Sequence, residues 1–182
     1  MTVKEGWTGR YFEDFEVGDV YQHPLGRTIT EADNVWFTLL TCNTNMLHFN
    51  NHYAEHSTFG KTLVNSGFTL ALVMGQSVSD VSQQAVANLG LDEVRFTHPV
   101  FVGDTLYAES IVLAARPSAS RPYAGIVTVR TRGLNQNGDE CLRYRRNVLV
   151  YRRGHAHDRD LFPEAAEPLT LDGEQEAERR RH

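Results

Sequence analysis

The stretch 63-LVNSGFTLALVMGQSVSD-80 decides how the rest of the chain must fold. Its apolar residues would surround the axis of a helix nearly completely, and a helix that is apolar all round belongs inside a protein. Asn65 or Ser66 can cap the first turn, and Gly67 leaves backbone N–H groups uncovered near the start. The sequence therefore predicts a buried helix whose positive N-terminal end can receive an oxyanion.

After this helix the chain changes to runs of β-branched and aromatic residues separated by Gly, Pro or Asn-Gly. Such runs predict strands, and the Asn137-Gly138 pair between the last two predicts a tight antiparallel hairpin. The predicted strands are VRFTHPVF (94–101), DTLYAESIVLAA (104–115), YAGIVTVRTRGL (123–134) and ECLRYRRNVLVY (140–151). We therefore expect an α+β domain in which a curved antiparallel sheet holds the central helix.

A shorter strand and helix precede the buried helix. The segment YQHPLGRTIT (21–30) predicts a strand, and the hydroxyl of Thr30 can cap a helix whose first turn carries Glu31 and Asp33. Apolar residues at helical spacing continue to residue 40, where an Asn-rich stretch ends the pattern. A polar loop should therefore lead from this helix to His48.

Length and composition exclude several classes of protein. The 182 residues with 41% hydrophobic content are enough for one good core, and the net charge of −5 argues against a nucleic-acid partner. No apolar run approaches the roughly 20 residues needed to cross a bilayer, and the N-terminus lacks the apolar core of a secretion signal. Two cysteines cannot build a disulfide framework. We therefore expect a cytoplasmic protein with neither a nucleic-acid nor a membrane partner.

The charge is concentrated at the C-terminus. Residues 155–182 hold four Arg against eight Asp or Glu, two prolines and few large apolar side chains. Such a segment buries too little apolar surface to offset the entropy of ordering it. We predict one domain over residues 1–154 and an acidic, weakly ordered tail over residues 155–182.

Seven of the sixteen residues from 41 to 56, just before the buried helix, are Asn or His. His48, His52 and His56 lie four residues apart, which on one helix would stack three imidazoles and suggests a metal site. No Cys and no carboxylate other than Glu55 stands at a ligand-like offset. We therefore expect no bound metal.

Two further patterns are open to more than one interpretation. Cys42 stands six residues before His48 and is a possible nucleophile, although a small buried thiol is more usual. Nine Arg between residues 116 and 153, with only two acids, can attract phosphates. The alternative is an ordinary solvated sheet face, which would carry the pairs Arg130/Arg132 and Arg143/Arg145.

Five segments agree in order and spacing with one known family: GRYFEDFEVGDVY (9–21), RTITEADNVWF (27–37), LTCNTNMLHFN (40–50), FGKTLVNSGFTLAL (59–72) and HPVFVGDTLYAES (98–110). Together, over residues 8–152, they resemble the MaoC-like dehydratases, the (R)-specific enoyl-CoA hydratase group of the hotdog fold. The Asn-rich pattern and VNSGFTLAL (64–72) are most similar to members acting on branched C5 substrates, such as mesaconyl-CoA or itaconyl-CoA hydratases.

The resemblance implies a hotdog fold, an antiparallel sheet wrapped around a central helix, with two subunits pairing as a homodimer or a dimer-based oligomer to build active sites at their interface. It also implies an acyl-CoA thioester substrate and no separate cofactor, since coenzyme A is part of the substrate. In the family motif an Asp and a His five residues later hold the water, and an amide N–H at the helix start receives the thioester oxygen. These positions are Asn43, His48 and Gly67 here, so the acid is missing.

An Asn can orient water but cannot accept a proton, so His48 must carry the acid and base chemistry. We expect reversible hydration of a short, methyl-branched 2-enoyl-CoA. Two alternatives stay open: a hotdog thioesterase, and a catalytically silent acyl-CoA-binding or partner subunit. The remaining candidates around the substrate are Asn45 and Asn65, mainly as supports of the loop and the helix cap, together with Ser66 and Phe68.

Overall fold

The computed structural model describes residues 4, 6–156, 163–167 and 169, and Thr8–His155 form one compact unit. A second unit comprises Met1–Trp7 and Ala156–His182, and its described residues contain no helix or strand. Most of the predicted acidic tail lies outside the described residues. In the described part of the chain, no helix is long and apolar enough to cross a membrane.

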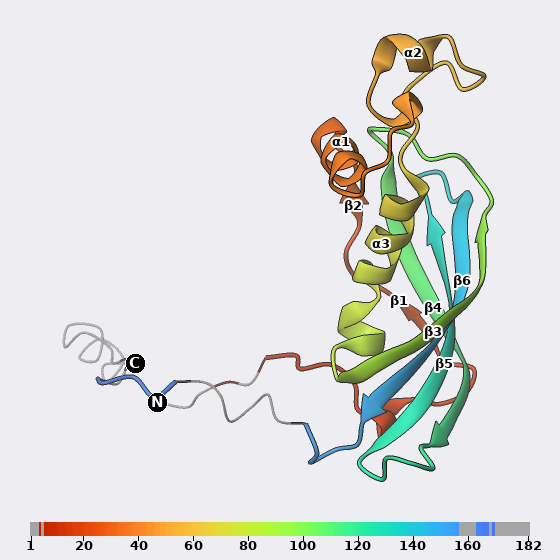
Figure 1. Ribbon diagram of the computed structural model, residues 1–182. Helices are drawn as coiled ribbons and strands as arrows, with labels where there is room; N and C mark the ends of the chain where they lie inside the picture. Colours follow the sequence, from red (N-terminus) through yellow and green to blue (C-terminus); the bar gives the residue numbers. More distant parts are fainter. Residues whose placement is uncertain (1–3, 5, 157–162, 168, 170–182) are drawn as a thin grey trace, which may run out of the picture. The chain divides into compact units, whose positions relative to one another are not determined.

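All strands of the compact unit pair in antiparallel fashion (Figure 1). The main path of the sheet runs β1-β4-β5-β6-β3, and β2 pairs with β4. The bounds are β1 Val20–Gln22, β2 Arg27–Thr28, β3 Ala85–Phe96, β4 Thr105–Pro117, β5 Ala124–Leu134 and β6 Glu140–Tyr151. The strand that directly follows the central helix, β3, thus lies at one edge, and the other edge is formed near the N-terminus.

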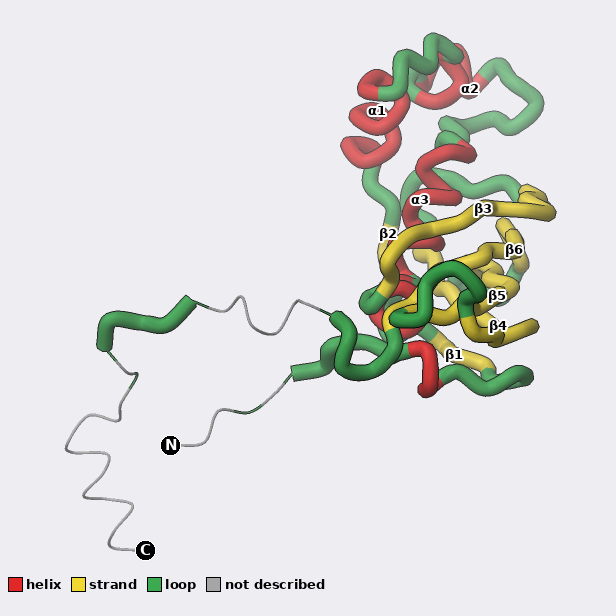
Figure 2. Tube along the Cα trace, turned by 60° about the horizontal axis from the view of Figure 1, so that its bottom comes forward, coloured by secondary structure: helices red, strands yellow, loops and turns green. Residues whose placement is uncertain are grey.

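Within the described residues, three α-helices accompany the sheet: α1 Glu31–Leu40, α2 Asn51–Glu55 and α3 Ser66–Gln76. Helix α3 lies along one face of the sheet, while α1 and α2 gather near its N-terminal end (Figures 1 and 2). Short 3-10 helices cover Phe12–Asp14 and Met46–His48, and a π-helical turn, Val78–Ser82, follows α3. This arrangement brings the polar segment before α3 next to the helix start.

The core fills the space between α3 and the sheet. Val73 of α3 is fully buried and lies over Gly133 of β5, where a Cβ atom would come within 2.6 Å of a Val73 methyl group. Only a glycine therefore allows this close approach of helix and sheet. The opposite side of α3 is exposed at small residues such as Ala71 and Gly75, so the expected complete burial of this helix is wrong on that face.

The structure confirms the α+β architecture and the predicted start of α1, where Thr30 and Asp33 form a capping box. The predicted hairpin at Asn137-Gly138 is also confirmed, with Gly138 at φ +87° between antiparallel β5 and β6.

Two strand predictions need correction. The segment 21–30 forms two short strands instead of one, because Pro24 cannot donate a backbone hydrogen bond in the middle of a strand. The strand predicted at 94–101 is wrong in its position, since β3 covers Ala85–Phe96 and the chain leaves the sheet before Pro99.

Candidate active site

His48 ends the short 3-10 helix Met46–His48, which Asn45 caps by accepting a hydrogen bond from the Leu47 N–H at 3.1 Å. The side chain is held inward, because His48 is only 8% exposed and its Nδ1 lies 2.9 Å from the backbone oxygen of Leu63. A carbonyl oxygen can only accept, so Nδ1 carries the proton. The neutral imidazole therefore has its free electron pair on Nε2, which makes Nε2 a base.

Asn43 is half-buried and lies in the turn between α1 and His48. Its N–H donates to the backbone oxygen of Thr38 at 3.0 Å, and its Oδ1 accepts from the Asn45 N–H at 3.0 Å. No hydrogen bond joins the side chains of Asn43 and His48 within the described residues. The asparagine thus shapes the turn and keeps its Nδ2 donor available to a water or substrate.

Asn65 is the N-cap of α3 and is almost fully buried. Its Oδ1 accepts from the Gly67 N–H at 2.9 Å, and its Nδ2 donates to Thr38 Oγ1 at 3.1 Å. The amides of Ser66 and Phe68 have no acceptor among the described residues. An oxyanion at this helix end would therefore meet two open donors and would compete with Asn65 for the third, at Gly67.

Ser66 and Phe68 differ in their surroundings. Ser66 is exposed, whereas Phe68 is half-buried and packs edge-on against Phe37 of α1, with ring centroids 5.5 Å apart. A Cβ atom at Gly67 would come within 3.2 Å of the Phe37 ring. The start of α3 is thus packed against α1 on one side and open on the other.

A cavity of about 260 Å³ opens on this other side. It is lined mostly by apolar groups: Phe59, Leu63, Val64, Ser66, Thr69, Phe96, Thr97, His98, Pro99, Val100 and Cys141. Of the predicted catalytic residues and Ser66, only Ser66 lines this cavity. His48 does not line it, but its Nδ1 is bonded to the backbone oxygen of Leu63, which is a lining residue. Cys42, considered above as a nucleophile, is exposed and is not part of this lining.

A larger cavity, of about 580 Å³, is lined by charged side chains of the sheet that include Arg130, Arg132 and Arg143. Three acids line it as well, and two of them, Glu109 and Glu140, pair with these arginines. The expected alternation of arginines on a solvated sheet face is thus present, with its charge largely balanced. None of the predicted site residues lines this cavity.

The three spaced histidines do not share one helix face. His48 belongs to the 3-10 helix, whereas His52 lies in α2 and His56 directly follows it. The rings of His52 and His56 are 4.8 Å apart and both residues are exposed. In the described part of the chain, no group of three or more His, Cys, Asp or Glu residues could hold a metal ion.

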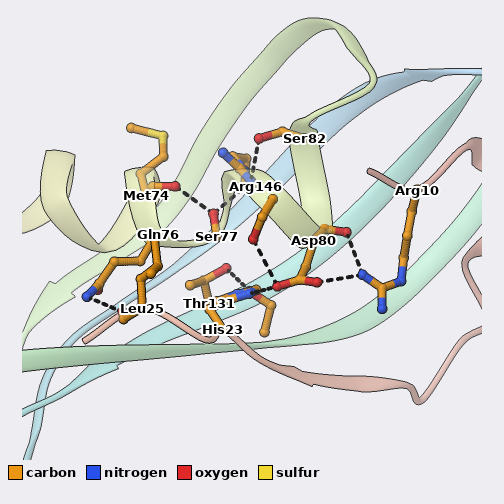
Figure 3. Close-up of polar contacts among 12 residues, drawn as sticks. Arg10, His23, Leu25, Met74, Gln76, Ser77, Asp80, Ser82, Thr131 and Arg146 are labelled. Atoms are coloured by element: carbon orange, nitrogen blue, oxygen red, sulfur yellow. Dashed lines mark hydrogen bonds and ion pairs between the residues drawn. The ribbon is translucent and has the colours of Figure 1, made fainter. Parts of the chain in front are cut away.

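A charged network that no local sequence pattern indicates lies at the far end of α3 (Figure 3). Asp80 accepts from Arg10 Nη1 at 2.7 Å and from His23 Nδ1 at 2.9 Å. His23 Nε2 in turn lies 2.9 Å from Ser110 Oγ, which also lies 2.7 Å from Thr131 Oγ1.

This order of acid, imidazole and hydroxyl is that of a hydrolase triad, but Ser110 is 1% exposed and its hydroxyl is shared by two partners. Burial lowers the pKa of His23, against the opposing effect of Asp80. Burial would raise the pKa of Asp80, but the bonds from His23 and Arg10 outweigh it and hold that pKa low. We interpret the network as structural.

Comparisons with known proteins identify the family of this chain. The family model described as mesaconyl-CoA hydratase matches residues 2–178. The chain belongs to the mesaconyl-CoA hydratase family. It is 38% identical to a mesaconyl-CoA hydratase of Cereibacter sphaeroides over 81% of this chain and 43% of the relative. It is 34% identical to a β-methylmalyl-CoA dehydratase of Chloroflexus aurantiacus over 80% of this chain and 41% of the relative.

Solved structures place the family in the MaoC-like hotdog group. A MaoC domain dehydratase of Chloroflexus aurantiacus superimposes with a TM-score of 0.79 and 32% identity, covering 93% of this chain and 47% of that one. A MaoC-like dehydratase of Rhodospirillum rubrum has a TM-score of 0.70 and 31% identity, covering 80% of this chain and 99% of that one. The predicted hotdog fold and MaoC-like membership are thus confirmed. The chain spans about half the length of the curated mesaconyl-CoA hydratases it matches.

Proposed function

We propose that this protein catalyses the reversible hydration of a short, methyl-branched 2-enoyl-CoA, with mesaconyl-CoA as the reference substrate. The names of the relatives support the substrate class. The observation that carries the proposal is the bond from His48 Nδ1 to the Leu63 carbonyl oxygen, because in the neutral imidazole it makes Nε2 the nitrogen that can accept a proton. The sequence predicted the acid and base chemistry for this same residue, His48.

In the hydration direction, His48 Nε2 takes a proton from water while the water oxygen bonds to C3 of the enoyl group. The electron pair of the double bond moves toward the thioester, and negative charge develops on its oxygen. The imidazolium then returns a proton to C2, which gives the 3-hydroxyacyl-CoA. One base suffices for both proton transfers, and dehydration follows the same steps in reverse.

The charge on the thioester oxygen needs donors. The first turn of α3 offers the N–H groups of Ser66, Gly67 and Phe68, of which Gly67 is already bonded to Asn65. Each such donor is worth roughly 3 kcal/mol of transition-state stabilisation in comparable sites. Asn43 then orients the water through its Nδ2 group, in the position where the family motif has an acid.

We also propose that a second copy of the chain completes the site. Strand β3 is the last strand of the sheet path, and its exposed apolar side chains include Leu89, Leu91 and Phe96. An edge strand of this length with apolar side chains favours pairing with another strand. Sedimentation analysis should find a dimer, and a fully active monomer would contradict this part of the proposal.

The test of the function is a substrate panel. The absorbance of the conjugated enoyl thioester should decrease on incubation with mesaconyl-CoA and less rapidly with crotonyl-CoA, without release of free thiol. Thiol release from saturated acyl-CoA would instead identify a thioesterase. Binding of acyl-CoA with no turnover of any enoyl-CoA would identify a silent subunit and overturn the proposal.

A further inference from the structure

Asn34 of α1 was not among the predicted site residues, yet it contacts three of the segments that build the site. It is fully buried, and its Nδ2 group donates to the backbone oxygens of His48, at 2.8 Å, and Leu63, at 3.1 Å. Its Oδ1 accepts from the Asn65 N–H at 2.9 Å. One amide thus joins the histidine segment, the chain leading into α3 and the cap of α3.

The carbonyl oxygen of Leu63 is shared between this amide and the imidazole. It accepts from Asn34 Nδ2 and also from His48 Nδ1. The position of this oxygen decides which ring nitrogen of His48 keeps a proton, because Nδ1 must remain a donor to it. Asn34 therefore holds the group that orients the imidazole, while its second bond holds the backbone of His48 itself.

Thr38 continues the same buried face of α1 one turn later, as residues four apart on a helix do. Its Oγ1 accepts from Asn65 Nδ2 at 3.1 Å, and its backbone oxygen accepts from the Asn43 N–H at 3.0 Å. Asn34 and Thr38 are both fully buried. The buried face of α1 that carries them therefore contacts every segment that holds a predicted catalytic group.

We propose that Asn34 is a positioning residue for His48, holding the imidazole with Nδ1 protonated and Nε2 free, and that Thr38 supports it by holding the backbone of Asn43 and the side chain of Asn65. The kinetic part of this inference rests on the proposed hydratase activity. The protonation pattern of the ring does not, so it is measurable in the protein without substrate.

The requirement at position 34 is narrow. The side chain here donates to two neighbouring carbonyl oxygens and accepts from one neighbouring N–H, and within that space only a short primary amide can do both. Aspartate has the same shape but, even when protonated, can donate to at most one of the two carbonyls. Alanine removes all three bonds and leaves buried backbone groups unsatisfied.

The experiment compares Asn34→Ala with Asn135→Ala in the full chain. Asn135 is also buried and makes three comparable bonds, with Asn137 and Asp139 in the β5–β6 hairpin, so its loss should cost similar stability. Imidazole nitrogen-15 NMR, with His48 assigned by its absence in His48→Gln, reports which ring nitrogen is protonated. Asn34→Asp, with its unchanged shape, serves as the second variant if the alanine variant does not fold.

The wild type and Asn135→Ala should show His48 with a protonated Nδ1 and a free Nε2. Asn34→Ala should show a substantial population with Nε2 protonated, and Asn34→Asp a smaller one. A displaced base should also lower kcat about 10²-fold with little change in KM, whereas Asn135→Ala should retain kcat.

A folded Asn34 variant whose His48 ring nitrogens are protonated as in the wild type would overturn the inference, as would equal losses of kcat in the two alanine variants. If the wild type hydrates no enoyl-CoA, the proposed function fails while the NMR comparison still decides the role of Asn34.

Discussion

At the N-terminal end of α3 the hydrogen-bonded side chains are neutral amides, a hydroxyl and an imidazole, whereas at its C-terminal end they include the partly exposed Asp80 and Arg10 and the buried His23. Both ends join segments distant in the sequence. Among the described residues, the imidazole of His48 has a hydrogen-bond partner at Nδ1 alone, whereas that of His23 has one at each ring nitrogen. The proposed function requires this difference, with a base available for chemistry at the first end and a network that stabilises the fold at the second.

The first test of this contrast between the two ends of α3 is the loss of His48. Replacing His48 with alanine should lower kcat about 10² to 10⁴-fold, because the proposed mechanism gives both proton transfers to this imidazole. Far-ultraviolet circular dichroism should be unchanged. His52→Ala is the matched control, since that histidine is exposed on α2 and should retain wild-type kcat. Equal activity in the two variants would remove the distinction between the ends of the helix.

The second test removes the centre of the charged network. Asp80→Ala leaves Arg10 without its 2.7 Å partner and the buried His23 without an acceptor for Nδ1. Breaking such a pair should lower the free energy of unfolding by about 3 kcal/mol in urea titrations, while the folded variant keeps its kcat.

Glu109→Ala is the control for this test. Glu109 pairs with Arg132, whose side chain is 49% exposed, so its loss should cost under about 1 kcal/mol. If the two substitutions lower the free energy of unfolding equally, the network at Asp80 contributes no more to stability than an exposed ion pair does.

A smaller effect is expected at Asn43. Asn43→Ala removes the acceptor of the Asn45 N–H and the donor proposed for water, which should lower kcat roughly tenfold at the value of one hydrogen bond. Asn43→Asp keeps the acceptor and therefore the turn, so it separates the two roles. A loss in Asn43→Ala as large as in His48→Ala would mean that the asparagine does more than orient water.

The sequence predicted those parts of the structure whose signals are local. The capping residues of α1 and the Asn137-Gly138 turn act over a few residues, and both were confirmed. The strand predicted at 94–101 was misplaced because the preceding residues, Ala85 to Glu93, contain Gly, Asn and Asp, and pairing with β6 overrides their low strand propensity.

The site was predicted only in part, for the same reason. Asn43, His48 and Gly67 came from the family resemblance, and their catalytic roles stay predictions. Asn34 was missed because its bonds reach 14 to 31 residues along the chain, and His23 because its acid partner is 57 residues away. Such pairs depend on how the helices pack, which no short pattern of residues records.

The last test measures how the stability contributed by His23, at the C-terminal end of α3, depends on pH. Because burial lowers the pKa of His23 below 6.5, the unfolded chain binds more protons than the folded protein as the pH falls below 6.5. The stability that a neutral His23 contributes is therefore complete above pH 6.5 and is lost as the pH falls toward the lowered pKa. Asp80 adds a second loss of stability at lower pH, since its pKa is held below 3.8 and its unfolded form is protonated first.

Urea titrations of the wild type between pH 7.5 and 5.5, a range of about two units around the reference pKa, should show the decline in stability that His23 causes. His23→Gln should be less stable at neutral pH yet flatter across the range. A decline that is equally steep in His23→Gln would assign the acid sensitivity to another group and leave the network at Asp80 without its distinguishing property.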